Sequence, residues 1–314
     1  MTEPGGGPGV PAPALADPNL ARPHLARVLD GALSYLDIRY ATVTGWRPLT
    51  LDLHLPREPN GPVPVVVYAH GGGFVGGLKE MGPWATLPAR GIAVATVGYR
   101  LAGEVAHPGP IEDVLAAIRW VRARGGEYGL DASRVAGWGS SAGAYLMARA
   151  AFCDDVSPGS PVGDHAEVSA RLSALVLHYP VTDFGELLSE ASTVGEREAA
   201  ATMVRTFLGV PDGPDQKQLA DTSVTAAARR ACFRPPVHLS HGADDRRCGV
   251  AQSRRLHEVV LAEGGESALL VVPRADHADP VFATPVVVEP AVEFLRTVWA
   301  RSPHTDHDNG GNET

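Results

Sequence analysis

A continuous apolar run that ends in three glycines constrains the fold of this chain more than any other feature. Residues 63–69 are Val-Pro-Val-Val-Val-Tyr-Ala, and His70 with Gly71, Gly72 and Gly73 follow directly. A run of this kind, without polar alternation, is typical of a parallel strand that is covered on both faces. Glycines after such a strand let the backbone turn sharply and approach a bound group closely. The run therefore predicts a buried sheet with a functional loop at the end of one strand.

Apolar runs and helical patterns alternate along the rest of the chain. Further runs that predict strands lie at 92–97, 134–139, 172–179, 236–240 and 268–272. Between two of them, apolar side chains recur three and four positions apart from Ile111 to Val121, which is typical of a helix. This alternation predicts an α/β protein with a mostly parallel sheet and helices on both faces. Ahead of these runs, residues 38–43 and 49–55 are expected to form an antiparallel pair at one edge.

The chain divides into one folded domain and two terminal segments. Residues 1–18 are mostly Gly, Pro and Ala, and residues 302–314 are polar, so both are expected to be disordered tails. We place a single domain at residues 19–301. Within it, residues 184–231 separate two strands by far more than a usual connection, which predicts a cap or lid insertion. We expect this insertion, together with a helix near residues 25–35, to wall a substrate pocket.

Charge and composition exclude several classes of protein. The 314 residues carry a formal net charge of −9, which argues against nucleic acid as a partner because phosphate binding needs clustered Lys and Arg. No apolar run approaches the roughly 18 residues of a membrane-spanning helix. Cys153, Cys232 and Cys248 are odd in number and widely spaced, so neither a disulfide framework nor a zinc site is predicted. With no secretory signal pattern at the N-terminus, we expect a cytoplasmic protein.

The segment Gly139-Ser140-Ser141-Ala142-Gly143 matches the pattern Gly-x-Ser-x-Gly. A strand-like run precedes it, and a helix-forming run rich in Ala, Leu and Met follows it. A tight turn between strand and helix strains the central serine and lifts its hydroxyl above the sheet. This context predicts that Ser141 is a nucleophile.

The glycines after the first buried strand suit the stabilisation of an oxyanion. Acyl transfer builds negative charge on a carbonyl oxygen, and preorganised backbone N–H groups stabilise that charge. We assign the N–H groups of Gly72, Gly73 and Ala142 as donors, and we expect His70 to brace the loop.

Gly71, Gly73 and Gly76 also fit the spacing of a dinucleotide fingerprint. That fingerprint requires an acidic residue at the end of the next strand, and residues 97–100 are Val-Gly-Tyr-Arg. A nucleotide site is therefore disfavoured.

A serine nucleophile needs a histidine base and an acid that orients it. In this type of fold the acid and then the histidine follow the serine, each after a later strand. Asp244 and Asp245 both follow the strand-like run at 236–240, and His277 follows the next one. The order Ser141, aspartate, His277 is satisfied, with Asp245 or Asp244 as the acid. By contrast, His178 and His238 lie within predicted strands and are expected to be satisfied core residues.

Together these segments resemble the α/β-hydrolase superfamily, specifically the hormone-sensitive lipase-like carboxylesterases and the bacterial group of feruloyl and acetyl-xylan esterases. The matching segments are 70–74, 99–102 with Glu112-Asp113, 139–143, 179–183, 241–245 with Gln252-Ser253, and His277. The resemblance implies an α/β-hydrolase fold with an eight-stranded sheet, a triad of Ser141, His277 and Asp245, and an acyl-enzyme reaction without cofactor or metal. It also implies that Arg100 and Asp113 form a structural ion pair.

The resemblance predicts a serine hydrolase that cleaves a carboxylic ester of a small or medium substrate. Phe74, which ends the segment His-Gly-Gly-Gly-Phe, is assigned to substrate binding. Ser140 before the nucleophile and Cys248-Gly249 after the acid depart from the family's usual residues, which leaves the substrate open. The alternatives are an arylformamidase of the N-formylkynurenine type, a biosynthetic acyl hydrolase or cyclase, and a non-catalytic ligand-binding protein. Monomer and homodimer both remain open.

Overall fold

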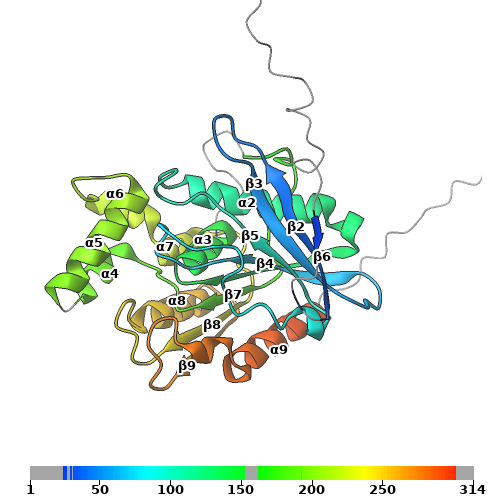
Figure 1. Ribbon diagram of the computed structural model, residues 1–314. Coiled ribbons are helices and arrows are strands. Elements are labelled where there is room, and N and C mark those ends of the chain that lie inside the picture. Colours follow the sequence, from blue (N-terminus) through cyan, green and yellow to red (C-terminus); the bar gives the residue numbers. More distant parts are fainter. Residues whose placement is uncertain (1–23, 27–28, 30, 153–161, 192, 302–314) are drawn as a thin grey trace, which may run out of the picture.

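The computed structural model describes residues 24–26, 29, 31–152, 162–191 and 193–301. Within them one sheet has the strand order β1-β2-β3-β5-β4-β6-β7-β8-β9. The strands are β1 (His24–Ala26), β2 (Ala32–Ala41), β3 (Leu49–Pro56), β4 (Val63–Ala69), β5 (Ala93–Val97), β6 (Leu130–Ser140), β7 (Leu175–His178), β8 (Val237–Gly242) and β9 (Ser267–Val272). The α-helices are α2 (Gly109–Arg124), α3 (Ala142–Ala151), α4 (Phe184–Glu190), α5 (Val194–Leu208), α6 (Gln216–Thr222), α7 (Val224–Arg230), α8 (Ala251–Ala262) and α9 (Pro285–Arg301), and short 3-10 helices lie at Pro88–Arg90, Gly125–Tyr128 and Pro280–Ala283. This architecture confirms the predicted α/β fold (Figure 1).

The sheet is parallel from β5 through β4 to β9 and antiparallel at the other edge, where β3 pairs with β5 and β2 with β3. The expected antiparallel pair is therefore present, and β2 to β9 supply the expected eight strands. In the part of the chain that the structure describes, β1 adds a ninth strand against β2.

The helix expected near residues 25–35 is wrong. This stretch contains β1 and the start of β2, which pair antiparallel at the edge of the sheet opposite β9. Along β2 buried and more exposed residues alternate, with Ala32 and Ser34 buried and Leu33 exposed. That period of two is typical of a strand. Because β1 and β2 lie at the edge of the sheet opposite β9, this segment does not line the pocket.

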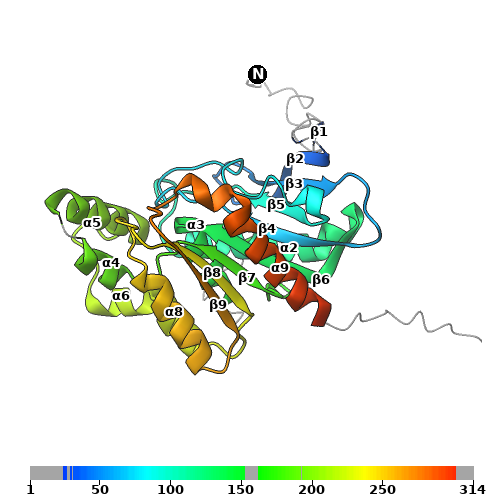
Figure 2. The ribbon, with the colours of Figure 1, turned by 90° about the horizontal axis from the view of Figure 1, so that it is seen from below.

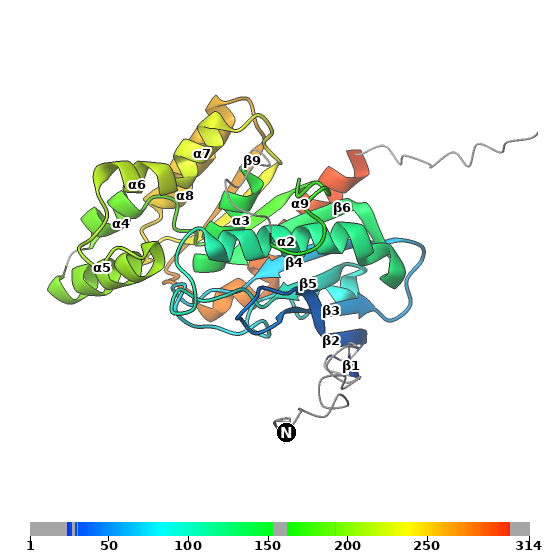
Figure 3. The same cartoon turned by 90° about the horizontal axis from the view of Figure 1, so that it is seen from above.

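Successive side chains of the central strands enter two different cores. In β4, Val65 and Val67 pack on the face covered by α2, α3 and α8, whereas Val66 and Tyr68 pack on the face covered by α9. Figures 2 and 3 show α9 and α2 on these opposite faces. Burial on both sides explains why the strands of this sheet are continuous apolar runs.

The insertion between β7 and β8 is helical, and α4, α5 and α6 stand together beside the sheet (Figures 1 and 3). Helix α5 begins with a capping box, in which Thr193 and Glu196 satisfy each other's backbone N–H groups. Its buried Phe207 anchors it, because the ring stacks on Phe74 with centroids 3.9 Å apart. The expected helical insertion is thus fixed to the domain at the loop that follows β4.

A buried ion pair joins the Arg100 guanidinium and the Asp113 carboxylate, with contacts of 2.6 to 3.1 Å, as the resemblance implies. Among the described helices, none has the length and apolar character needed to cross a membrane.

Candidate active site

Ser141 lies in the sharp turn between β6 and α3, with φ of 53° and ψ of −117°. A non-glycine residue in this region of backbone space is strained, and such strain is common at functional sites. The flanking glycines make the turn possible. A Cβ on Gly143 would lie 2.1 Å from the Ala69 carbonyl oxygen, and one on Gly139 would lie 2.4 Å from the Gly143 carbonyl oxygen. The Gly-x-Ser-x-Gly segment therefore has the strand-turn-helix context that the sequence predicts.

The glycine loop after β4 lies directly against this turn. A Cβ on Gly71 would be 3.4 Å from the Ser141 Cβ, and Gly73 lines the same cavity as Ser141. Gly72 has φ of +128°, and a Cβ there would lie 2.0 Å from the Gly76 carbonyl oxygen, so the loop conformation requires glycine. The buried His70 braces the loop, because its ring stacks on Tyr99 and its Nδ1 lies 2.7 Å from the Gly71 carbonyl oxygen.

The assignment of Phe74 to substrate binding is wrong for its side chain. Phe74 is fully buried and does not line the cavity that contains Ser141. Its ring packs among Tyr145, Phe184 and Phe207. With φ of 66°, the backbone turns this ring away from the loop surface and into the core beneath α5. Phe74 thus holds the loop and the insertion together.

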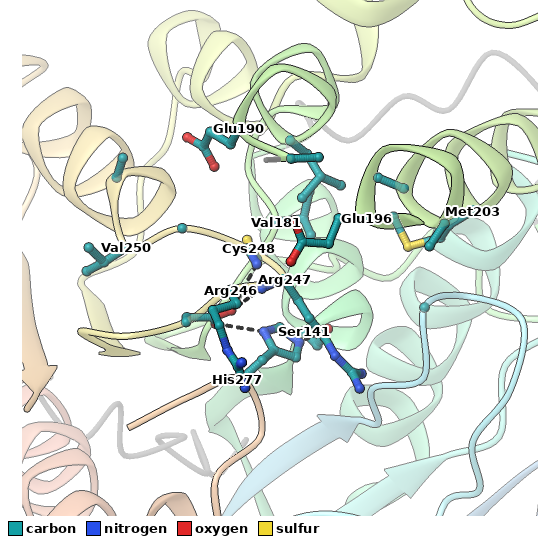
Figure 4. Close-up of a pocket in the computed structure, with 18 of the residues that line it drawn as sticks. Ser141, Val181, Glu190, Glu196, Met203, Arg246, Arg247, Cys248, Val250 and His277 are labelled. Carbon is teal, nitrogen blue, oxygen red and sulfur yellow. Dashed lines mark hydrogen bonds and ion pairs between the residues drawn. The ribbon is translucent and has the colours of Figure 1, made fainter. Parts of the chain in front are cut away.

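The structure brings Ser141, His277 and Asp245 into one hydrogen-bonded series. His277 Nε2 lies 2.9 Å from Ser141 Oγ, and His277 Nδ1 lies 2.7 Å from Asp245 Oδ2 (Figure 4). Asp245 follows β8 and His277 follows β9, so the carboxyl ends of neighbouring parallel strands position both groups. Of the two aspartates that the sequence offers, Asp245 is buried and contacts His277, whereas Asp244 is exposed.

The Asp245 carboxylate has hydrogen-bond partners at both oxygens. Oδ1 accepts the backbone N–H groups of Arg247 and Cys248, each at 2.9 Å. Oδ2 contacts His277 and also the Nε2 atom of His241 at 3.2 Å. Burial alone would raise the pKa of Asp245, but the hydrogen bonds from His241, His277 and the backbone hold it well below its ordinary value. The carboxylate therefore stays ionised and able to orient His277.

Tyr179 and His241 contact the triad, and the sequence patterns did not single them out for such a role. The Tyr179 ring packs edge-on against His277 with centroids 4.7 Å apart, and its φ of 39° directs the chain out of β7 at this point. Their positions in the sequence could have indicated this role, because Tyr179 directly follows β7 and His241 is near the end of β8. Parallel sheets place functional groups at these strand ends.

The two core histidines are buried as expected, but only one has a partner among the described residues. His238 Nε2 lies 3.3 Å from Ser240 Oγ. Within the described residues, neither ring nitrogen of His178 has a hydrogen-bond partner, so the expectation that this core histidine is satisfied is wrong.

A cavity of about 840 Å³ opens at Ser141 and His277. The insertion supplies much of its wall, as the sequence predicts. Its apolar and small lining residues include Val181, Leu187, Ala191, Gly195, Ala199, Ala200, Met203, Ala243, Val250 and Ala251. Its charged lining residues are Glu190, Glu196, Asp245, Arg246 and Arg247. An apolar cavity with a few polar groups around a nucleophile suits a small organic substrate.

No group of three His, Cys, Asp or Glu side chains within the described ranges is arranged to hold a metal ion. His304 and His307 of the polar C-terminal segment, which the sequence does not favour as metal ligands, lie outside those ranges.

Comparison with known proteins decides the family of this chain. A model of the family BD-FAE matches residues 51–260, which contain Ser141 and Asp245. The chain belongs to the BD-FAE family. This membership confirms the resemblance to α/β-hydrolase esterases on which the sequence interpretation rests.

Two relatives of this BD-FAE member are named as esterases. It is 26% identical over 243 residues to "Probable isoprenylcysteine alpha-carbonyl methylesterase ICME" of Oryza sativa subsp. japonica, covering 75% of this chain and 56% of the rice protein. It is 41% identical over 107 residues to carboxylesterase NlhH of Mycobacterium tuberculosis, covering 33% of this chain and 34% of that protein. The chain thus spans about half or less of the length of these relatives.

A solved structure shares the fold. The truncated form of a carbohydrate esterase from gut microbiota superposes with a TM-score of 0.73 and 22% sequence identity, covering 85% of this chain and 96% of that one.

Proposed function

We propose that this BD-FAE family member is a serine carboxylesterase that cleaves esters of small or medium molecules through an acyl-enzyme on Ser141. The observation that carries the proposal is the hydrogen-bonded series from Ser141 through His277 to a buried Asp245, placed at the mouth of a cavity. The family and the esterase relatives support the same reaction class.

In the first half of the reaction, His277 Nε2 accepts the Ser141 proton while Ser141 Oγ attacks the ester carbonyl carbon. The N–H groups of Gly72, Gly73 and Ala142 donate to the developing oxyanion. The carbon–oxygen bond to the alcohol then breaks, and the alcohol leaves with the proton from His277. Asp245 keeps Nδ1 of His277 protonated and stabilises the imidazolium that forms.

In the second half, His277 takes a proton from water, and the resulting nucleophile attacks the acyl-enzyme carbonyl. Ser141 leaves with the proton from His277, and the carboxylic acid product is released. The substrate is the only small-molecule partner that this cycle requires besides water. No side chain in it needs a cofactor, and cytoplasmic location stays a prediction from the sequence.

The experiment is steady-state hydrolysis of 4-nitrophenyl acetate by the wild type and by Ser141→Ala. We expect kcat to fall by about four orders of magnitude or more, because the nucleophile is lost. Ser189→Ala, on the exposed part of α4, is the matched control and should keep wild-type activity. An unchanged thermal midpoint in Ser141→Ala would show that the fold is intact, and full activity in that variant would reject the proposal.

The alternative functions are tested with the same purified proteins and with other substrates. An N-formyl arylamine tests the arylformamidase, and a thioester with an added amine or alcohol acceptor tests the biosynthetic hydrolase or cyclase. The non-catalytic ligand-binding alternative predicts no Ser141-dependent turnover of any of them. The complete Ser141, His277 and Asp245 contacts favour an enzyme over such a scaffold.

A further inference from the structure

Arg247 is a charged residue on the cavity wall that the proposed reaction does not use. Its backbone N–H donates to Asp245 Oδ1 at 2.9 Å, so the side chain begins at a point fixed relative to the triad. Figure 4 shows that the side chain then extends past Ser141, with its guanidinium beyond the serine. The residue is exposed, so the guanidinium stands at the open side of the cavity.

The charge of Arg247 is unneutralised, in contrast to that of its neighbour. The Arg246 guanidinium is paired with Asp276, whose Oδ2 lies 2.9 Å from Nε. Over the described ranges, the Arg247 guanidinium has neither a hydrogen bond nor an ion pair, and the bond to Asp245 involves only its backbone. A planar guanidinium with five free donors matches the geometry of a carboxylate, which it can bind through two parallel hydrogen bonds.

The opposite end of the cavity has the opposite character. Glu190 lies on the far side of Ser141 from the Arg247 guanidinium (Figure 4). Val250 lies on the same side of Ser141 in Figure 4, and a Cβ on the preceding Gly249 would be 3.0 Å from Glu190 Oε2. Burial raises the pKa of Glu190, and hydrogen bonds from Gln252 and the Gly249 backbone oppose that rise. The Glu190 carboxylate would repel an acyl group that carries a negative charge, so this end suits a neutral acyl group.

We propose that Arg247 forms a carboxylate subsite, and that the enzyme prefers esters with a neutral acyl group and a carboxylate on the alcohol or phenol part. This inference rests on the proposed carboxylesterase function and names its substrate class. The carboxylate sits beside Ser141 on the Arg247 side, and the acyl group enters the part of the cavity lined by Glu190 and Val250. Hydrolysis of such an ester consumes one water and releases a short carboxylic acid and a hydroxy-carboxylate.

The first test measures binding and needs no turnover. Titration calorimetry compares 3-hydroxybenzoate, which mimics the released phenol, with its uncharged methyl ester, using the full chain. In Arg247→Gln we expect Kd for the carboxylate to rise by about tenfold relative to Kd for the methyl ester, since the charge-assisted hydrogen bonds to the carboxylate are lost. Arg274→Gln removes the same charge from an exposed position outside the cavity, and it should leave this ratio unchanged.

The second test measures turnover of two ester pairs. One pair is 3-acetoxybenzoate and its methyl ester, with the charge on the phenol; the other is 4-nitrophenyl hydrogen succinate and its methyl ester, with the charge on the acyl group. The ratio of kcat/KM for charged over neutral substrate should fall about tenfold in Arg247→Gln for the first pair only. Added salt should lower the same ratio in the wild type.

The possible outcomes distinguish the carboxylate subsite from the proposed carboxylesterase activity. The subsite is overturned if the wild type binds 3-hydroxybenzoate and its methyl ester equally, even if neutral esters are hydrolysed. It is also overturned if Arg247→Gln keeps the wild-type ratio of the two Kd values. An equal loss of affinity for the carboxylate and the methyl ester in Arg247→Gln also overturns the subsite, since it would indicate a merely structural role. Arg247-dependent carboxylate binding without Ser141-dependent turnover would instead support the subsite and reject the carboxylesterase.

Discussion

The Nε2 atom of His241 lies 3.2 Å from Oδ2 of Asp245, the same carboxylate oxygen that contacts His277. The other contacts of His241 determine which nitrogen carries its hydrogen. Nε2 is 2.7 Å from the Cys248 carbonyl oxygen, which can only accept, so Nε2 is the donor. Nδ1 then accepts from the Ser253 hydroxyl at 2.7 Å. The same Nε2 hydrogen also faces Asp245 Oδ2 at the longer distance, so a second, fully buried histidine supports the triad acid from behind.

Replacing this second histidine should weaken catalysis without removing any group that touches substrate. In His241→Leu, which has similar volume but no donor, we expect kcat for 4-nitrophenyl acetate to fall by about tenfold, the cost of one hydrogen bond to a charged group. Ser253→Ala should cause a smaller fall, because it loosens His241 only indirectly. Stopped-flow kinetics at fixed pH, with thermal midpoints as the fold control, measure both. Wild-type kcat in a folded His241→Leu protein would contradict this account.

The nucleophile turn tolerates no side chain at Gly143. A Cβ there would lie 2.1 Å from the Ala69 carbonyl oxygen and 2.4 Å from that of His70, and both atoms belong to the backbone. Gly143→Ala should lower the free energy of unfolding by about 3 kcal/mol, the upper range for overpacking, and also displace Ser141. Gly103→Ala is the matched control because a Cβ there meets open space. Urea unfolding curves measure the difference, and equal stability of the two variants would show that the turn is less crowded than described.

Burial of His178 should make the stability depend on pH. Desolvation by burial, with a smaller contribution from His238, lowers the pKa of His178 to about 3. The unfolded chain, with an ordinary histidine pKa of about 6.5, binds a proton that the folded protein does not, so stability falls as the pH decreases from about 6.5 towards 3. At about pH 5 this histidine alone should cost about 2 kcal/mol.

The variant that tests this dependence is His178→Phe, which keeps an aromatic ring next to Trp138 and Phe282. Between about pH 7 and 5, its free energy of unfolding from urea titrations should fall by about 2 kcal/mol less than that of the wild type. Parallel pH curves for the two proteins would show that His178 takes up a proton in the folded state as readily as in the unfolded chain.

Much of this site could be predicted from the sequence because local patterns encode it. The strand before Ser141, the helix after it and the tight glycines are neighbours in the chain, so they mark the turn without tertiary information. The order of Asp245 and His277 after successive strands placed them at one end of the sheet. The choice between Asp244 and Asp245 rested on the family resemblance, since the two residues have the same local sequence context.

The errors arose where distant segments decide the outcome. Phe74 is buried because Phe207 of the insertion, more than a hundred positions later, stacks on it. The segment at 25–35 is not the predicted helix, because its backbone pairs within the sheet edge formed by β1, β2 and β3. No sequence pattern predicts the direction of the Arg247 side chain. It depends on the hydrogen bond from the Arg247 backbone N–H to Asp245 and on the open side of the cavity.

The measurement that tests the central claim most directly is active-site labelling with a fluorophosphonate, followed by intact-mass and peptide mass spectrometry. The wild type should gain one adduct, located on Ser141, and a fluorophosphonate-treated protein should no longer hydrolyse 4-nitrophenyl acetate. Ser141→Ala should gain none, and labelling of His277→Ala should be slower by about a hundredfold or more, since the general base is lost. An adduct on another residue, or esterase activity that survives complete labelling of Ser141, would contradict the account.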